Sequence, residues 1–262
     1  YPVIKSLALS FYDFEGGDYL FCGINNYVTM CKDPVFWKSL GNTFIYLAIQ
    51  VPVMVILSLI LGVLVEESFL RFRTCYRVSV FLPSVTALVA YAMIFKLLFN
   101  TDFGLVNHIL RTFGLGGVDW LNTVWGARAV VIMGITWRWT GYNMVFYLAG
   151  LQNIDYSVYE ASYIDGATPF QQFMKITIPL LKPTILMTAI MSTSGTLQLF
   201  DESMNLTAGG PGKSTMTLAH YIYNISFVET PKFNYAAALS VCILVMVAVL
   251  SAIQMKVGDK RD

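Results

Sequence analysis

Gly212, Lys213 and Ser214 have the spacing that most resembles a ligand-binding motif. They end like a phosphate-binding loop, whose pattern is G-x-x-x-x-G-K-[ST]. The first glycine of that pattern would fall at position 207, which is Thr207, and no apolar strand precedes the stretch. The sequence therefore argues against a nucleotide-binding loop here.

The residues that usually hold metals or transfer protons are few and scattered. His108 and His220 are the only histidines, and they lie far apart in the sequence. Asp201 and Glu202 are adjacent, so on a helix their carboxylates point in different directions. We therefore expect neither a metal site nor a catalytic pair of carboxylates, and no enzyme activity on this chain.

Composition indicates the solvent in which the chain folds. Apolar residues make up 56% of the chain and charged residues only 13%, and the mean hydropathy is +0.61. A soluble domain contains roughly 25% charged residues. So much apolar surface favours a lipid bilayer as the environment, and no basic block suggests nucleic acid.

Five stretches are long and apolar enough to cross a bilayer, which takes about 20 residues. They span residues 43–65, 78–99, 129–150, 184–200 and 235–255, and 184–200 is the most interrupted by polar side chains. Backbone groups in hydrocarbon must be satisfied within the segment, so these spans should be helices. The sequence predicts an all-α, polytopic bundle of membrane helices.

Basic residues distinguish the two sides of the membrane. They are about twice as dense in 66–77, 151–183 and the tail as in 1–42, 100–128 and 201–234, and the positive-inside rule places the denser set in the cytoplasm.

With a cytoplasmic C-terminus, five spans leave residue 1 outside. The opening run YPVIKSLALSF is typical of the end of a preceding helix. We therefore expect a missing first span and a longer natural chain.

Of the four cysteines, Cys22 and Cys31 lie in the predicted outer segment and could pair, but nothing in the sequence demands it. Reduced thiols are the simpler expectation.

Residues 151–183 are a polar connection between two spans, with local signals for a helix–turn–helix. Asp155 and Ser157 can cap a short helix that runs to about residue 165, and Gly166 can end it in a left-handed conformation. Pro169 suits the first turn of a second helix, whereas Pro179 and Pro183 should stop or kink the chain before the next span. A protruding, partly apolar helix favours a groove on another protein over a loop lying on the membrane surface.

The stretch EASYIDGATPFQQFMKITIPLLKP resembles the coupling loop of permease subunits of bacterial binding-protein-dependent ABC importers, with Ser162 where the signature usually has a third residue Ala. The matching residues are Glu160, Ala161, Asp165, Gly166, Ala167, Phe173, Ile176, Ile178, Pro179 and Pro183. In that family the first short helix docks in a cleft of the ATPase subunit. The resemblance assigns coupling to Glu160, Ala161, Ser162, Asp165, Gly166, Ala167, Ile178 and Pro179.

A second stretch, LTAGGPGKSTMTLAHYIYNISF at 206–227, resembles the outer loop of permeases that import sugars, oligosaccharides and glycerol phosphates. The resemblance implies contact with a solute-binding protein. The residues expected to make it are Gly209, Gly210, Pro211, Ser214 and Thr215.

Polar side chains inside the predicted spans are costly and tend to face a cavity or another helix. Aromatic faces beside amides and hydroxyls would suit a sugar, but small polar residues also pack helices closely. For Ser192–Thr196, both lining of a sugar path and packing between helices stay open. For Asn143, Tyr147 and Gln198, lining of the sugar path is favoured. The candidate substrate path is Trp137, Asn143, Tyr147, Ser194 and Gln198.

The predicted fold class is thus the all-α helix bundle of a type I ABC importer permease, with five complete spans and the end of a preceding one. We expect three segments: the end of a first helix and an outer loop at 1–42, a transmembrane domain at 43–257, and a cytoplasmic tail at 258–262. The resemblance implies a multi-pass protein of the bacterial inner membrane that moves a sugar, oligosaccharide or related polyol or sugar phosphate by alternating access.

The partners that the resemblance implies are a second homologous permease, two ATPase subunits that bind ATP and Mg, and a periplasmic or lipid-anchored solute-binding protein. No cofactor is expected on this chain, and the sequence does not identify the sugar. An ion-coupled carrier would need an ionisable residue deep in the bundle and internal repeats. A membrane enzyme would need grouped carboxylates or histidines at the membrane surface, and neither pattern is present.

Overall fold

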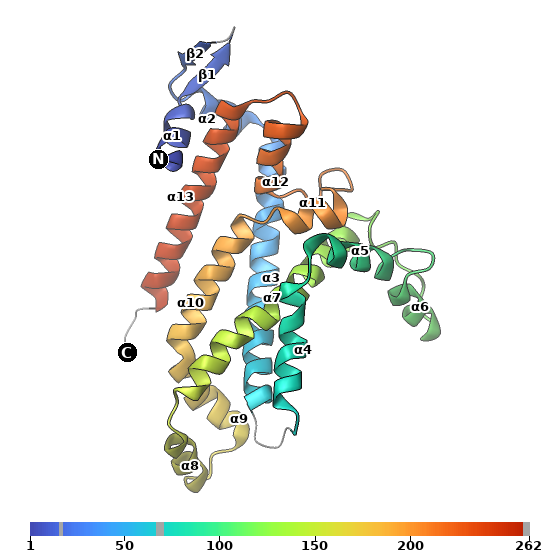
Figure 1. Cartoon of the computed structure of the whole chain (residues 1–262), viewed down its shortest axis with the longest axis vertical. Coiled ribbons are helices and arrows are strands. Elements are labelled where there is room, and N and C mark those ends of the chain that lie inside the picture. Colours follow the sequence, from blue (N-terminus) through green and yellow to red (C-terminus); the bar gives the residue numbers. More distant parts are fainter. Residues whose placement is uncertain (16–17, 67–70, 259–262) are drawn as a thin grey trace. The chain divides into compact units, whose positions relative to one another are not determined.

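The structure is a computed structural model that describes residues 1–15, 18–66 and 71–258, and these residues are mostly helical (Figure 1). The strands among them form one short antiparallel hairpin. The elements are α1 (Pro2–Leu9), β1 (Tyr12–Glu15), β2 (Asp18–Phe21), α2 (Asn25–Lys32), α3 (Pro34–Glu66), α4 (Arg73–Val85), α5 (Leu88–Leu98), α6 (Leu105–Thr112), α7 (Val124–Gln152), α8 (Tyr156–Ile164), α9 (Pro169–Gln172), the π-helix η1 (Phe173–Thr177), α10 (Ile178–Leu197), α11 (Asp201–Thr207), α12 (Leu218–Tyr223), the π-helix η2 (Asn224–Val228) and α13 (Phe233–Gly258).

Four of the five predicted spans correspond to long helices, α3, α7, α10 and α13, and the helices are longer than the apolar stretches alone. The first begins at Pro34 rather than at residue 43, and the last runs from Phe233. Among the described residues, three helical stretches have both the length and the composition of a membrane span: Pro34–Glu66, Pro169–Leu197 and Phe233–Gly258. The bent pair α4–α5 is a fourth candidate span if its two helices are counted as one. The expected number of five stays a prediction.

The predicted continuous span at 78–99 is wrong in one respect, because the helix is interrupted at Thr86 and Ala87. Thr86 has extended backbone angles, φ −68° and ψ 137°. The hydroxyls of Ser84 and Thr86 donate to the carbonyl oxygens of Phe81 and Leu82 at 2.7 and 3.1 Å. Such local bonds compete with the helical ladder, and Pro83 removes one donor from it. A hydropathy pattern does not register either effect.

The chain folds into two compact units, and α3, α7, α10 and α13 contribute residues to both. The first unit comprises 1–49, 87–134 and 193–250, and the second comprises 50–86, 135–192 and 251–262. In the first unit, apolar side chains of α2, α3, α12 and α13 share one core, in which Leu218 and Leu239 are fully buried. In the same unit α5 packs against α11.

The carboxylate of Asp33 connects three segments of the first unit. Its Oδ2 accepts hydrogen bonds from the hydroxyls of Tyr221 in α12 and Tyr235 in α13, at 2.5 and 2.8 Å. Its Oδ1 accepts from the backbone N–H of Val35 at 2.8 Å. Partial burial acts to raise the pKa of Asp33, but the hydrogen bonds from the two tyrosines and the backbone outweigh it and hold that pKa below its ordinary value.

The second unit depends on close approach between helices. At Gly141 in α7, an added Cβ would lie 1.9 Å from the carbonyl oxygen of Val80 in α4, so only glycine allows this contact. Leu59, Tyr147 and Leu181 form a buried cluster between α3, α7 and α10.

The N-terminal segment contains more structure than the sequence predicted. The opening run forms the short helix α1, and its expected role as the end of a preceding span stays a prediction. The hairpin that follows was not predicted; it pairs Tyr12 with Phe21 and Phe14 with Tyr19. Asn26 in α2 supports it by donating to the carbonyl oxygens of Ser10 and Tyr12, at 3.0 and 2.9 Å. At the other end α13 runs to Gly258, and the rest of the predicted tail, 259–262, lies outside the described residues.

We predict that Asp33→Ala lowers the free energy of unfolding by about 1–3 kcal/mol, because two largely buried tyrosine hydroxyls lose their acceptor. The measurement is the thermal unfolding midpoint of purified protein in detergent, with Asp102→Ala at an exposed position as the control. Because the pKa of Asp33 is lowered, its contribution is present above the unfolded value of about 3.9 and is lost as the pH falls below it. Equal midpoints for the two variants at pH 7 would contradict the role of Asp33.

Candidate functional site

The connection between α7 and α10 is the helix–turn–helix that the sequence predicted (Figure 1). Asp155 is the N-cap of α8, and its carboxylate accepts from the backbone N–H of Ser157 at 3.0 Å. This hydrogen bond holds the pKa of Asp155 below its ordinary value. The helix therefore begins at a side chain that satisfies one of its free backbone donors.

Gly166 ends α8 with a left-handed backbone, φ +79°. The N–H of Gly166 donates to the carbonyl of Tyr163, and the N–H of Ala167 donates to that of Ser162, at 3.0 and 2.9 Å. This pair of bonds is a Schellman motif, which satisfies the last carbonyls of a helix. Thr168 then starts α9 through a capping box with Gln171. Hydrogen bonds between residues close in sequence thus fix both the end of α8 and the start of α9.

The expectation that Pro179 or Pro183 stops the chain before the next span is wrong, while the alternative, a kink at these prolines, stays a prediction. The helix is continuous from Pro169 to Leu197, with the π-helix η1 immediately before α10. Pro179 and Pro183 both lie inside this continuous helix, Pro179 just after the π-helix η1. The π turn, rather than a proline break, is the local irregularity.

Hydrogen bonds join α8 to α9 and η1, which follow the turn at Gly166. The Tyr159 hydroxyl lies 2.9 Å from Thr177 Oγ1, and Gln172 Nε2 donates to Ser162 Oγ at 2.9 Å. Ser162 is buried, and its hydroxyl donates to the carbonyl of Tyr159 at 2.8 Å. Ser162 therefore supplies a hydrogen-bonding contact that alanine, the usual residue of the signature, would lack.

The outer face of the loop carries apolar side chains in solvent. Tyr163 and Ile164 are 78% and 83% exposed, and Tyr156 and Phe170 are also exposed. Glu160, Ala161, Asp165 and Gly166 lie on the same exposed loop, while Ala167, Ile178 and Ser162 are partly or fully covered and Pro179 is exposed. The structure thus presents most of the predicted coupling residues on one protruding segment.

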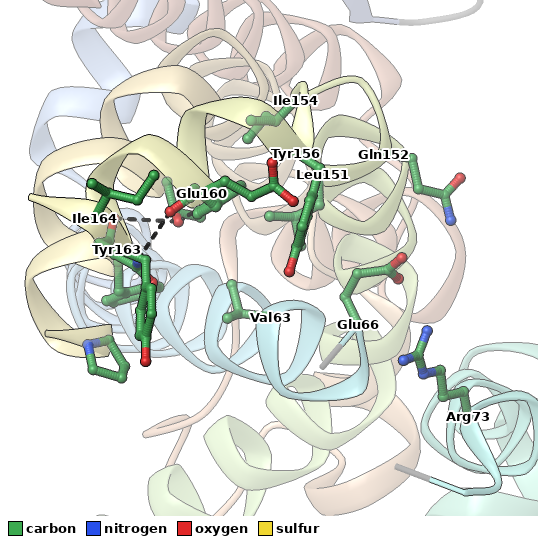
Figure 2. A pocket seen from close by; sticks show the side chains of 15 residues that line it. Val63, Glu66, Arg73, Leu151, Gln152, Ile154, Tyr156, Glu160, Tyr163 and Ile164 are labelled. Carbon is green, nitrogen blue, oxygen red and sulfur yellow. Dashed lines mark hydrogen bonds between the residues drawn. The ribbon is translucent and has the colours of Figure 1, made fainter. Parts of the chain in front are cut away.

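A groove of about 920 Å³ runs beside this segment within the second unit. Glu66 and Arg73 lie at one end, and Glu160 and Tyr163 lie at the other (Figure 2). Glu66 also pairs with Arg77, with 2.5 Å between Oε2 and Nη2. The groove offers carboxylates, tyrosines and aliphatic side chains, which can receive side chains of another protein.

The candidate substrate-path residues belong to both units. Asn143 and Tyr147 are buried in the second unit: Asn143 Nδ2 donates to the carbonyl of Trp139 at 3.1 Å, and the Tyr147 hydroxyl lies 2.6 Å from Thr188 Oγ1. Trp137 in the same unit is 44% exposed. In the first unit, Gln198 is exposed and Ser194 is half-buried. For Asn143 and Tyr147 these contacts favour the packing interpretation.

In the predicted outer loop, the five residues expected to contact a binding protein are not equally accessible. Ser214 and Thr215 are 2% and 0% exposed, and Gly209 is buried as well. Gly210 and Pro211 are half-buried, whereas Gly212 and Lys213 are exposed. The Thr215 hydroxyl holds the loop, because it donates to the carbonyl of Gly210 at 2.8 Å and lies 2.6 Å from Thr207 Oγ1, whereas Ser214 is only buried. The accessible tip is Gly212–Lys213.

His220 is a buried residue that the sequence reasoning placed only in an outer loop. Its Nδ1 lies 2.8 Å from Ser203 Oγ, and the ring of Phe200 meets it edge-on at 5.8 Å. Burial lowers the pKa of His220. No sequence pattern indicated this contact, because Ser203 and His220 belong to different short helices.

In the described part of the chain, no three His, Cys, Asp or Glu side chains are grouped so that they could hold a metal ion. All four cysteines are free.

We predict that thermal stability falls as the pH is lowered from 7.5 to 5.5, because protonation charges a buried imidazole. The lowered pKa of His220 means that its contribution is present above the unfolded value of about 6.5 and is lost below it. The unfolding midpoint in detergent should depend less on pH in His220→Asn. His108→Asn, which alters the exposed second histidine, should keep the wild-type dependence. Identical pH profiles for all three proteins would contradict the prediction.

The family described as "Binding-protein-dependent transport system inner membrane component" matches residues 34–260. The chain is 49% identical to the lactose transport system permease protein LacF of Rhizobium radiobacter, over 100% of this chain and 89% of that protein. It is 31% identical to the arabinooligosaccharides transport system permease protein AraP of Bacillus subtilis (strain 168), over 98% of this chain and 82% of that protein.

The fold is similar to that of a chain in the crystal structure of a bacterial ABC transporter involved in the import of the acidic polysaccharide alginate. The TM-score is 0.85 at 22% sequence identity, and the match covers 97% of this chain and 88% of that chain. A second structure, of a bacterial alginate ABC transporter in complex with an alginate pentasaccharide-bound periplasmic protein, matches with a TM-score of 0.80 at 23% identity, over 91% of this chain and 83% of that chain.

Proposed function

Because the chain belongs to the family of inner membrane components of binding-protein-dependent transport systems, we propose that it forms one half of the membrane pathway of an ATP-driven importer for a sugar or sugar oligomer. Membership makes it a transport subunit and not an enzyme. The relatives named for lactose and arabinooligosaccharides support a carbohydrate substrate. The same membership argues against an ion-coupled carrier that acts alone.

The observation that carries the proposal is the rigid, capped helix α8, which exposes Tyr163 and Ile164 almost completely. The caps satisfy backbone groups at both ends of α8, yet its apolar side chains remain exposed. Covering such a face with a groove on another protein lowers the free energy, because it removes apolar surface from water. We assign that groove to the ATPase subunit, with Glu160 and the Gly166 turn at the joint.

In this account the chain binds neither ATP nor Mg, which belong to two partner ATPase subunits. ATP binding closes those subunits and moves α8. The Ser162–Gln172 and Tyr159–Thr177 hydrogen bonds transmit the movement from α8 to α9 and η1, which continue directly into α10. A second, homologous permease completes the pathway. Alternation between outward-facing and inward-facing states then carries the sugar across the membrane.

The orientation follows from the distribution of basic residues, which puts 151–183 and the C-terminus in the cytoplasm. The loop at 206–227 then faces the side from which a periplasmic or lipid-anchored binding protein delivers substrate. The alginate transporter solved with its periplasmic protein supports such a partner. We place the contact at the exposed Gly212–Lys213 tip rather than at the buried side chains of Ser214 and Thr215.

We predict that Gly166→Val reduces ATP-dependent sugar uptake about five- to thirtyfold in reconstituted vesicles. A left-handed conformation costs a side chain roughly 1–2 kcal/mol, which corresponds to that loss of correctly formed turns. No atom lies within 4 Å of the added Cβ, so the effect is conformational and not a clash.

The control for this variant is Gly114→Val in the loop after α6. Gly114 has a similar φ of +74° and equally open surroundings, so it introduces the same local strain elsewhere. Normal uptake by Gly166→Val, or equal losses in both variants, would contradict a coupling role for the turn.

The buried positions allow a separate prediction about the substrate path. Tyr147→Phe should reduce stability by about 0.5–1.5 kcal/mol, because it removes only the hydroxyl contact with Thr188. Uptake should keep the same dependence on sugar concentration, since the side chain is covered. Tyr142→Phe, five residues earlier in α7 and half-buried, is the control. A raised half-saturating sugar concentration in Tyr147→Phe alone would instead show that Tyr147 contacts substrate.

A further inference from the structure

The loop before α12 is held by side chains rather than by a backbone ladder. All five consecutive carbonyl oxygens from Gly212 to Met216 accept a hydrogen bond from a side chain elsewhere in the first unit. The donors and distances are Lys38 Nζ to Gly212 at 2.7 Å, Asn42 Nδ2 to Lys213 and to Met216 at 2.9 Å each, Arg128 Nε to Ser214 at 3.1 Å, and Ser203 Oγ and Tyr46 OH to Thr215 at 2.8 and 3.3 Å.

Most of these donors lie on one face of α3, because Lys38, Asn42 and Tyr46 are four residues apart. Asn42 is the central donor: it is 1% exposed, and its Oδ1 accepts from Arg128 Nη2 at 2.8 Å. The guanidinium of Arg128 lies over the ring of Trp125, 4.8 Å from its centroid. The donors are thus oriented by contacts of their own.

We call these donors, Lys38, Asn42, Tyr46, Arg128 and Ser203, the clamp. The clamp leaves one short segment in solvent, the tip Gly212–Lys213. Lys213 has a left-handed backbone, φ +63°, which is costly for a residue with a side chain. Backbone strain of this kind persists where the surrounding contacts impose it, and it often marks a functional position. Lys213 makes no ion pair within the described residues.

We propose that the tip is a preorganised cationic docking point for an acidic patch on the solute-binding protein, and that Asn42 is the residue that positions it. The inference rests on the proposed function, which places this loop on the binding-protein side. Since the carbonyls of the tip already accept hydrogen bonds from the clamp, Lys213 offers the partner a positive charge. A carboxylate is the protein group that best complements an exposed ammonium.

Because the loop is held before the partner arrives, docking requires little ordering of the loop. A preorganised contact loses less conformational entropy on binding than a flexible one. A charge at the rim of an interface mainly affects the rate of association and its dependence on salt. The charge of Lys213 therefore affects how readily the loaded binding protein engages, rather than how the sugar moves.

The test uses the complete transporter in lipid nanodiscs, with ATPase activity measured as the sugar-loaded binding protein is titrated. Lys213→Glu should raise the half-saturating concentration of binding protein about three- to tenfold at low salt, and the difference should shrink at high salt. Lys232→Glu reverses an exposed charge elsewhere in the same predicted outer segment and should behave as wild type. Equal effects of the two variants, or an effect insensitive to salt, would overturn the proposal.

Asn42→Asp tests the positioning role. The variant keeps an acceptor for Arg128 but cannot donate to Lys213 and Met216, so the tip should lose its fixed conformation. We expect a larger change in half-saturating concentration than in maximal rate, together with a weaker salt dependence. A fall in maximal rate alone would indicate general damage to the fold and contradict positioning.

Cross-linking separates failure of this proposal from failure of the proposed function. Lys213→Cys, joined to the binding protein by a short bifunctional reagent, should form a cross-link that depends on substrate loading. Cross-linking without any charge effect would contradict the cationic docking point but keep the loop at the interface. No cross-link would reject the interface itself. A Lys213→Glu effect that needs anionic lipid but no binding protein would assign the tip to the membrane surface instead.

Discussion

Helix ends leave backbone N–H and C=O groups without intrahelical partners, and the need to satisfy such groups governs the structure wherever a helix ends. Along the long helices the α-helical ladder satisfies them. At the ends, side chains take over: Asp155 and the Thr168–Gln171 capping box at the starts of α8 and α9, and the Gly166 motif between them. In the first unit, donors from α3, α7 and α11 satisfy the carbonyls of 212–216 in the same way.

Hydrogen bonds consequently fix the backbone of two loops that present exposed side chains to solvent, and this gives each loop an expected use. The loop 151–183 presents an apolar helix surface whose shape is set by its own caps and by the Tyr159–Thr177 and Ser162–Gln172 contacts. The loop at 206–227 presents a charged tip. A stiff connection can transmit a push or present a contact without first becoming ordered, which suits a subunit that depends on partners for both energy and substrate.

The parts of the fold that sequence predicted are those with local causes. The cap at Asp155, the turn at Gly166 and the start at Pro169 depend on residues within a few positions of one another, and the structure confirms all three. The apolar runs likewise located the long helices. The interruption at Thr86–Ala87 was missed because hydropathy does not register the hydroxyls of Ser84 and Thr86. The clamp joins Asn42 to Met216, which are too distant in sequence for any periodicity to connect them. The same distance explains why Ser214 and Thr215 looked accessible in sequence but are buried.

The central claim, that α8 engages an ATPase subunit on the cytoplasmic side, is tested most directly by cross-linking at its most exposed tyrosine. Tyr163→Cys, in a chain whose four native cysteines are replaced by serine, should cross-link to the ATPase subunit of the assembled transporter. The thiol should be inaccessible to a membrane-impermeant reagent in intact cells. A cross-link to the ATPase that changes in yield when ATP binds is the result that the account predicts. Labelling of the thiol from outside the cell, with no cross-link to the ATPase, would contradict it.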